Sequence, residues 1–85
     1  MSRPNKQRTV GAEDVLASRI ATERAARGWS YERIAQEMTA VGCPIQGSAI
    51  FKVEKGAPRR RVSVDELVAL SRVWAIPVGR LVGEE

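Results

Sequence analysis

The chain has 85 residues, a formal net charge of +4, one cysteine and no histidine. This length suits a single domain, and a lone cysteine cannot form an internal disulfide, which favours a reducing compartment. The lack of histidine excludes a Ser–His pair and a histidine metal site, so we expect no enzyme activity, metal or cofactor. No apolar run reaches the roughly 18 residues of a membrane span or resembles a signal peptide, so a cytoplasmic protein is expected.

Positive charge is concentrated in two segments. Residues 52–61 contain two lysines and three arginines against one glutamate, and residues 1–10 add three more cations, so the rest of the chain is net acidic. Basic patches on an acidic body are typical of a protein that binds a polyanion such as DNA. A surface that only aids solubility is the alternative.

Residues 1–11 are polar and basic, contain Pro4 and Gly11, and show no periodicity, which predicts a flexible arm. Residues 12–83 form the predicted domain. Its first helix begins near Glu13, carries an apolar side at Leu16 and Ile20, and ends at Gly28 as a left-handed cap.

The second helix is predicted over about residues 31–41. Ser30 is a suitable N-cap, and Ile34, Ala35 and Met38 form the apolar side. Gly42 then ends the helix, and Pro44 prevents its continuation.

The third helix is predicted over about residues 47–55. A helical projection places Ala49, Ile50 and Val53 on one side and the polar residues, with Phe51, on the other. An outward phenylalanine beside lysines suits a helix that enters the major groove, where lysine can pair with guanine and an aromatic edge can meet a thymine methyl. The alternative is that Phe51 packs under the loop at residues 57–61.

Two further helices complete an all-α fold of five short helices without a sheet. Ser63 and Glu66 form a predicted capping box at the start of the fourth helix, whose apolar side is Leu67, Leu70 and Val73 or Trp74. A short fifth helix is expected over residues 78–82.

Three segments, "ARGWSYERIA", "IFKVEKG" and "VSVDELVALSRVWAIPVGRLV", resemble the helix-turn-helix family of lambda-type repressors and Cro proteins, the XRE type. The resemblance covers roughly Leu16 to Val82. It implies a lambda-repressor-like domain and a sequence-specific double-stranded DNA-binding transcriptional regulator, a small Cro-like or phage-type repressor that acts by occupying an operator. The implied partners are DNA and a second copy of the chain in a homodimer, with no small-molecule ligand.

The resemblance also implies roles for individual residues. The base-facing set is Gln46, Gly47, Ser48, Phe51 and Lys52, and the phosphate contacts are Ser30, Tyr31, Lys55, Arg59, Arg60 and Arg61. Arg24 and Glu54 are expected to form a partly buried ion pair between the first and third helices. The basic arm, with Arg3, Lys6 and Arg8, is expected to follow the DNA backbone or enter a minor groove.

Some features depart from the family pattern. The turn at Thr39–Pro44 is longer than usual, and Gly47 stands where many members have a base-reading glutamine or arginine. The glycine mildly favours the competing hypothesis, a protein-binding module such as an antitoxin or a transcription bridging factor. Four apolar residues near the C-terminus are candidates for the dimer surface: Trp74, Val78, Leu81 and Val82. The alternative is that they are buried in the hydrophobic core.

Overall fold

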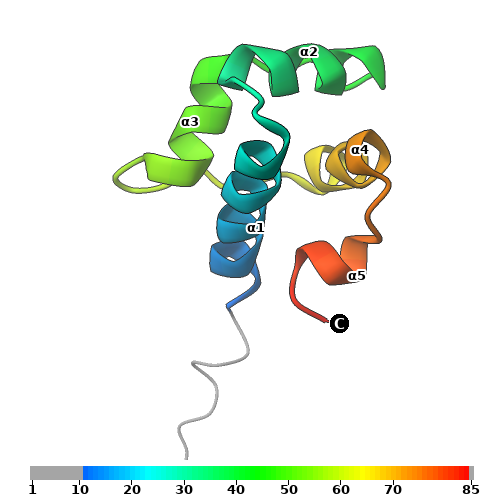
Figure 1. The fold of residues 1–85 in the computed structure, drawn as a ribbon. Helices are drawn as coiled ribbons and strands as arrows, with labels where there is room; N and C mark the ends of the chain where they lie inside the picture. Colours follow the sequence, from blue (N-terminus) through cyan, green and yellow to red (C-terminus); the bar gives the residue numbers. More distant parts are fainter. Residues whose placement is uncertain (1–10, 85) are drawn as a thin grey trace, which may run out of the picture.

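The computed structural model describes residues 11–84, which fold into five α-helices without a strand in that range (Figure 1). The all-α prediction is therefore confirmed for the described residues. The predicted arm with Arg3, Lys6 and Arg8 lies outside them. The helices are α1 (Ala12–Arg27), α2 (Tyr31–Ala40), α3 (Gly47–Lys55), α4 (Val64–Trp74) and α5 (Val78–Leu81).

The helix starts follow the predicted caps. The Ser30 hydroxyl accepts a hydrogen bond from the backbone N–H of Arg33 at 3.0 Å. At the start of α4, the Ser63 hydroxyl accepts from the N–H of Glu66 at 3.1 Å, and the Glu66 carboxylate accepts from the N–H of Ser63 at 2.9 Å. These are the reciprocal bonds of a capping box.

The helix ends depend on two glycines with positive φ. Gly28 has φ 66° after α1, and Gly42 has φ 91° after α2. Around Gly42, the N–H of Cys43 donates to Met38 O at 3.0 Å and that of Gly42 to Thr39 O at 2.9 Å, the pattern of a Schellman motif. This motif ends α2 at Ala40, one residue before the expected limit.

All five helices contribute to one hydrophobic core. Its largest fully buried side chains are Ile20, Ile34, Met38, Ile50, Leu70 and Leu81. Trp74 and Leu81 are only 6% and 0% exposed, so the core interpretation holds for both, and neither can form a dimer surface.

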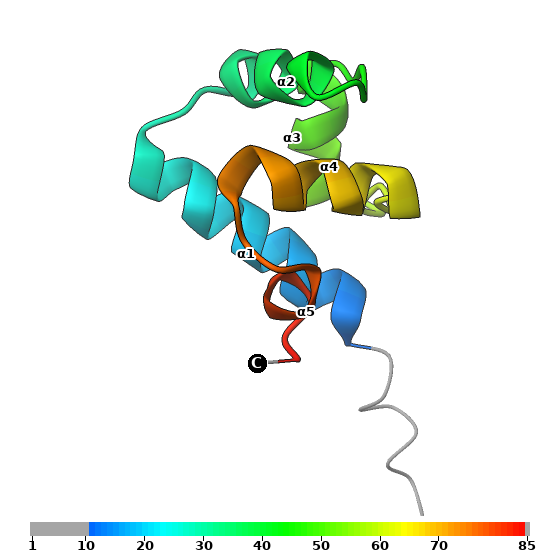
Figure 2. The ribbon, with the colours of Figure 1, turned by 90° about the vertical axis from the view of Figure 1, so that its right-hand side faces the viewer.

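Helices α3 and α4 lie on opposite sides of α1 in Figure 1, with α2 above them and α5 below α4. Figure 2, viewed from the side of α4, shows α4 in front of α3 and beneath α2. Helix α2 packs against both α3 and α4, and α1 packs against α3 and α5. Within residues 11–84, every helix is too short or too polar to cross a membrane.

Candidate nucleic-acid interface

Helix α3 buries one side and exposes the other, as its periodicity predicts. Ile50 and Val53 are 2% and 3% exposed, whereas Phe51 is 46% exposed. Ser48, Lys52 and Lys55 are exposed as well. The outward side of α3 therefore presents an aromatic ring, a hydroxyl and two ammonium groups to solvent.

Three predicted base-reading residues come together beside the N-terminal half of α3. Gln46, Ser48 and Lys52 line one shallow pocket of about 300 Å³. Arg60 and Glu66 form its far wall, from the loop after α3 and from the first turn of α4. The structure thus gathers an amide, a hydroxyl and an amine, which suit hydrogen bonds to base edges.

Gly47 lies apart from this pocket and against α2. A Cβ at this position would lie 3.2 Å from both the backbone C and O of Tyr31 and 3.3 Å from the carboxylate of Glu32. The glycine therefore permits the close approach of α2 and α3, and it contributes no side chain to the pocket.

Arg24 and Glu54 form the expected ion pair between α1 and α3. Arg24 Nε and Nη2 donate to the two carboxylate oxygens of Glu54 at 2.8 and 2.9 Å. The Glu54 side chain is 1% exposed and that of Arg24 is 18% exposed. Arg24 also donates from Nη1 to Trp29 O at 3.0 Å, which ties the pair to the connection before α2. The hydrogen bond with Glu54 raises the pKa of Arg24 above its usual value.

Tyr31 belongs to the same cluster, although it was expected to contact phosphate. Its hydroxyl donates to Glu54 at 3.1 Å, and its ring lies 4.2 Å from the guanidinium carbon of Arg24. Burial, followed by the charge of Glu54, raises the pKa of Tyr31. The Phe51 ring meets Tyr31 edge-on, with centroids 5.6 Å apart and an interplanar angle of 85°. One part of Phe51 thus packs on α2, which sets how the rest projects from α3.

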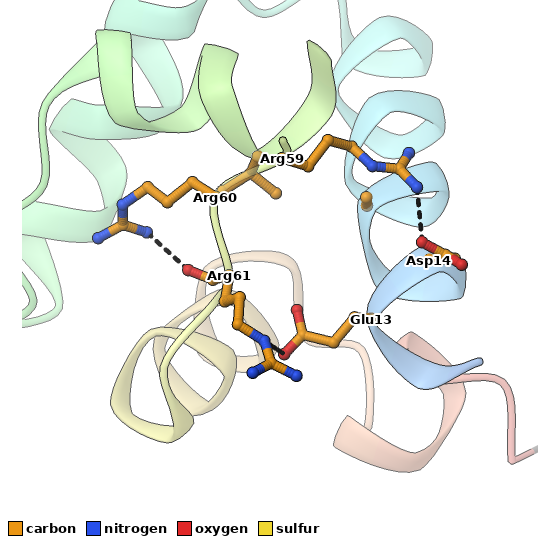
Figure 3. A pocket seen from close by; sticks show the side chains of 7 residues that line it. Glu13, Asp14, Arg59, Arg60 and Arg61 are labelled. Carbon is orange, nitrogen blue, oxygen red and sulfur yellow. Dashed lines mark hydrogen bonds and ion pairs between the residues drawn. The ribbon is translucent and has the colours of Figure 1, made fainter. Parts of the chain in front are cut away.

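The three arginines of the loop after α3 each pair with a carboxylate. Figure 3 shows two of these pairs, Arg59 with Asp14 and Arg61 with Glu13. Arg59 pairs with Asp14 at 2.5 Å and Arg61 with Glu13 at 3.6 Å, both on α1. Figure 3 shows the three side chains leaving the loop in different directions. They therefore do not converge on the pocket of about 280 Å³ that they line.

Arg60 points toward α4. Its two terminal nitrogens donate to the carboxylate of Glu66 at 3.0 and 2.9 Å. This hydrogen bonding lowers the pKa of Glu66 and raises that of Arg60. The Arg60 backbone N–H also donates to Lys52 O at 3.0 Å, so the loop folds back on the end of α3.

These ion pairs reduce the positive charge that the loop arginines can offer to a polyanion. Three guanidinium groups that form a basic run in the sequence are matched by three carboxylates from α1 and α4. Lys52 and Lys55 have no hydrogen bond or ion pair to a side chain within residues 11–84. The uncompensated positive charge in this region therefore lies on the outward side of α3.

Sequence reasoning missed the acidic partners. The sequence predicts Glu13 only as the start of the first helix and Glu66 only as part of a capping box, and it assigns Asp14 no role. No local spacing relates Asp14 to Arg59, because 45 positions separate them. The one available signal was that the rest of the chain is net acidic, opposite in charge to the basic residues 52–61.

Within residues 11–84, the structure brings together no group of three or more His, Cys, Asp or Glu that could hold a metal ion. Burial, with the nearby carboxylates of Glu66 and Asp65, raises the pKa of Cys43, so its reactive thiolate is disfavoured.

No family model, curated protein or solved structure matches this chain.

Proposed function

We propose that this protein is a sequence-specific double-stranded DNA-binding transcriptional regulator of the lambda-repressor-like helix-turn-helix type. Helix α3 enters the major groove as the recognition helix, and α2 supports it. The protein acts as a small Cro-like repressor that blocks transcription by occupying an operator.

The exposed side of α3 is the observation that carries this proposal. Lysines without partners, a half-exposed phenylalanine and a serine occupy one side of a helix whose other side is buried. Lysine can pair with guanine, and apolar groups can contact thymine methyl groups. Because Gln46 and Ser48 share a pocket with Lys52, these three residues are the proposed base readers.

The buried cluster beneath α3 supports the same role. A base-reading helix needs a fixed direction relative to its supports. Glu54 on α3 is bonded to Arg24 on α1 and to Tyr31 on α2, so one cluster sets the direction of α3 from two neighbouring helices.

A protein-binding module is the second candidate, and a specific observation favours it. The loop arginines are already matched by carboxylates, which reduces the net charge available to phosphates. Exposed ion pairs are weak, however, so phosphate oxygens can replace the carboxylates of Asp14 and Glu13.

Selection of bound sequences from random duplex DNA, followed by titration at several salt concentrations, separates the two candidates. An operator binder should enrich one motif and lose affinity steeply with salt; six to ten phosphate contacts correspond to about 10³- to 10⁵-fold between about 50 and 200 mM. Failure to enrich any motif, with weak binding to all duplexes alike, would contradict the proposal and leave the protein-binding candidate.

A further inference from the structure

The outer side of α4 carries exposed apolar and charged residues that the core does not use. Val64 is 76% exposed and Val68 is 38% exposed, which makes them two of the four exposed large hydrophobic residues in the described chain. Asp65 and Arg72 are exposed on the same helix. At 3.6 residues per turn these four side chains project within an arc of about 100°. We call them the α4 surface.

The two charges of the α4 surface lack partners within the described chain. Seven ion pairs occur there, each uses an arginine, and none uses Arg72. Asp65 has no ion pair or side-chain hydrogen bond to a described residue either. An unpaired anion and an unpaired cation thus lie on one exposed stripe, on either side of Val68.

We propose that the α4 surface binds a second copy of this chain through a two-fold axis near Val68. Asp65 and Arg72 are seven residues apart, about 10.5 Å along the helix, with their midpoint between Val68 and Ala69. When two such helices pack antiparallel about that midpoint, Asp65 of each copy faces Arg72 of the other. Both charges are then satisfied, because a two-fold interface uses the same surface twice.

Apolar contact supports this pairing. A groove of about 440 Å³ lies beside Val68, with Asp65 and Arg72 in its lining. The connection between α2 and α3 adds the apolar part of this lining: Val41, Cys43 and Pro44. In an antiparallel pair, this groove receives apolar side chains of the other copy, such as the exposed Val64. One helix and one turn bury less than the roughly 800 Å² per partner of a standard interface, so we expect a weak, concentration-dependent dimer.

Helix α3 remains uncovered in this arrangement. The α4 surface does not include Glu66, the α4 residue that lines the pocket with Gln46, Ser48 and Lys52, and Pro44 is the one residue shared by that pocket and the groove beside Val68. In Figure 1, α3 and α4 lie on opposite sides of α1. The α4 surface is thus the proposed contact of the expected homodimer, and this contact does not require DNA.

Charge reversal tests the proposal in the absence of DNA. Asp65→Arg gives a copy with two positive charges on the α4 surface, and Arg72→Asp gives a copy with two negative charges. Each variant alone should dimerise about ten-fold or more weakly than the wild type in sedimentation velocity, because like charges face each other. An equimolar mixture of the two should form a heterodimer, and the double variant Asp65→Arg/Arg72→Asp should recover the homodimer.

Circular dichroism confirms that each variant is folded before these results are compared. A mixture that stays monomeric overturns the proposal. A wild-type dimer that persists unchanged in both single variants also overturns it, because the interface then lies elsewhere.

Disulfide cross-linking provides a second test that leaves the charges in place. Val68→Cys in a Cys43→Ser background puts a thiol next to the proposed axis, where a disulfide between copies should form on mild oxidation. Ser18→Cys in the same background is the control, because Ser18 is exposed on α1. Equal or weaker cross-linking through position 68 than through position 18 would overturn the proposal.

Discussion

Removal of either partner of the Arg24–Glu54 pair should destabilise the domain, and the two costs should differ. Arg24→Ala leaves the Glu54 carboxylate 1% exposed in the native packing, with only the Tyr31 hydroxyl as a side-chain partner. Glu54→Ala leaves a guanidinium that is 18% exposed and still bonded to Trp29 O. Water can therefore solvate the unpaired guanidinium left by Glu54→Ala better than the unpaired carboxylate left by Arg24→Ala.

The magnitude follows from the bonds that each change removes. Removing one partner of a buried ion pair costs about 3–5 kcal/mol. We expect Arg24→Ala to cost about 4 kcal/mol, and Glu54→Ala about 2–3 kcal/mol because its orphaned partner reaches water. For an 85-residue chain, total stability is about 4–13 kcal/mol, so the arginine change removes a large fraction of it. Its Tm should fall by about 15–30 °C.

Urea unfolding followed by far-ultraviolet circular dichroism measures these costs, with the double variant completing a mutant cycle. The double variant should cost less than the sum of the single variants, because no unpaired charge remains buried. Arg19→Ala is the control: Arg19 pairs with Glu23 on the surface of α1 at 4.0 Å, a contact worth about 0.3–0.5 kcal/mol. Single variants that cost no more than this control, or that add without coupling, would refute the assignment of a buried orienting pair.

Three further predictions concern Lys52, Gly56 and Glu66, with Lys55 and Gly11 for comparison. Lys52→Ala should relax base preference in selection experiments and cost about 1–3 kcal/mol of binding free energy on the best site. Lys55→Ala should weaken binding to all duplexes alike. Two variants with the same effect on specific and random duplexes would contradict these roles. Gly56→Ala should destabilise by about 1–3 kcal/mol in urea titrations, because its Cβ would lie 2.6 Å from Lys52 O. Gly11→Ala, which meets nothing within 4 Å, should be tolerated as the control. Glu66→Gln should make stability less dependent on pH in acid. The lowered pKa of this carboxyl means that its stabilisation is complete above its unfolded pKa of about 4.3 and is lost as pH falls through the folded value. An unchanged acid limb in the pH profile of unfolding would contradict that assignment.

Much of the fold follows from local signals in the sequence. The caps at Ser30 and Ser63 and the glycines at 28 and 42 place the helix ends within one residue, because each bonds only to its own or adjacent turns. Which side of α3 is exposed can also be predicted from local signals. A period of 3.6 residues separates Ile50 and Val53 from the lysines without reference to any distant segment.

Family resemblance contributed one long-range contact that local signals could not. The Arg24–Glu54 pair joins residues 30 positions apart, and the bonds between their side chains confirm it. The same resemblance assigned Gly47 and Tyr31 to the DNA surface, and these assignments stay predictions. The structure adds that Gly47 packs against α2 and that the Tyr31 hydroxyl bonds with Glu54 of the buried pair.

The sequence by itself determined where helices start and stop, which side of each is apolar, and that α3 turns its lysines outward. Only the tertiary structure decided which charges remain uncompensated. Arg59, Arg60 and Arg61 read as a basic patch along the chain, but folding brings Asp14, Glu66 and Glu13 to them. The physical reason is that capping and periodicity act over a few residues, whereas Coulomb interaction and desolvation depend on distances that only the packed helices set.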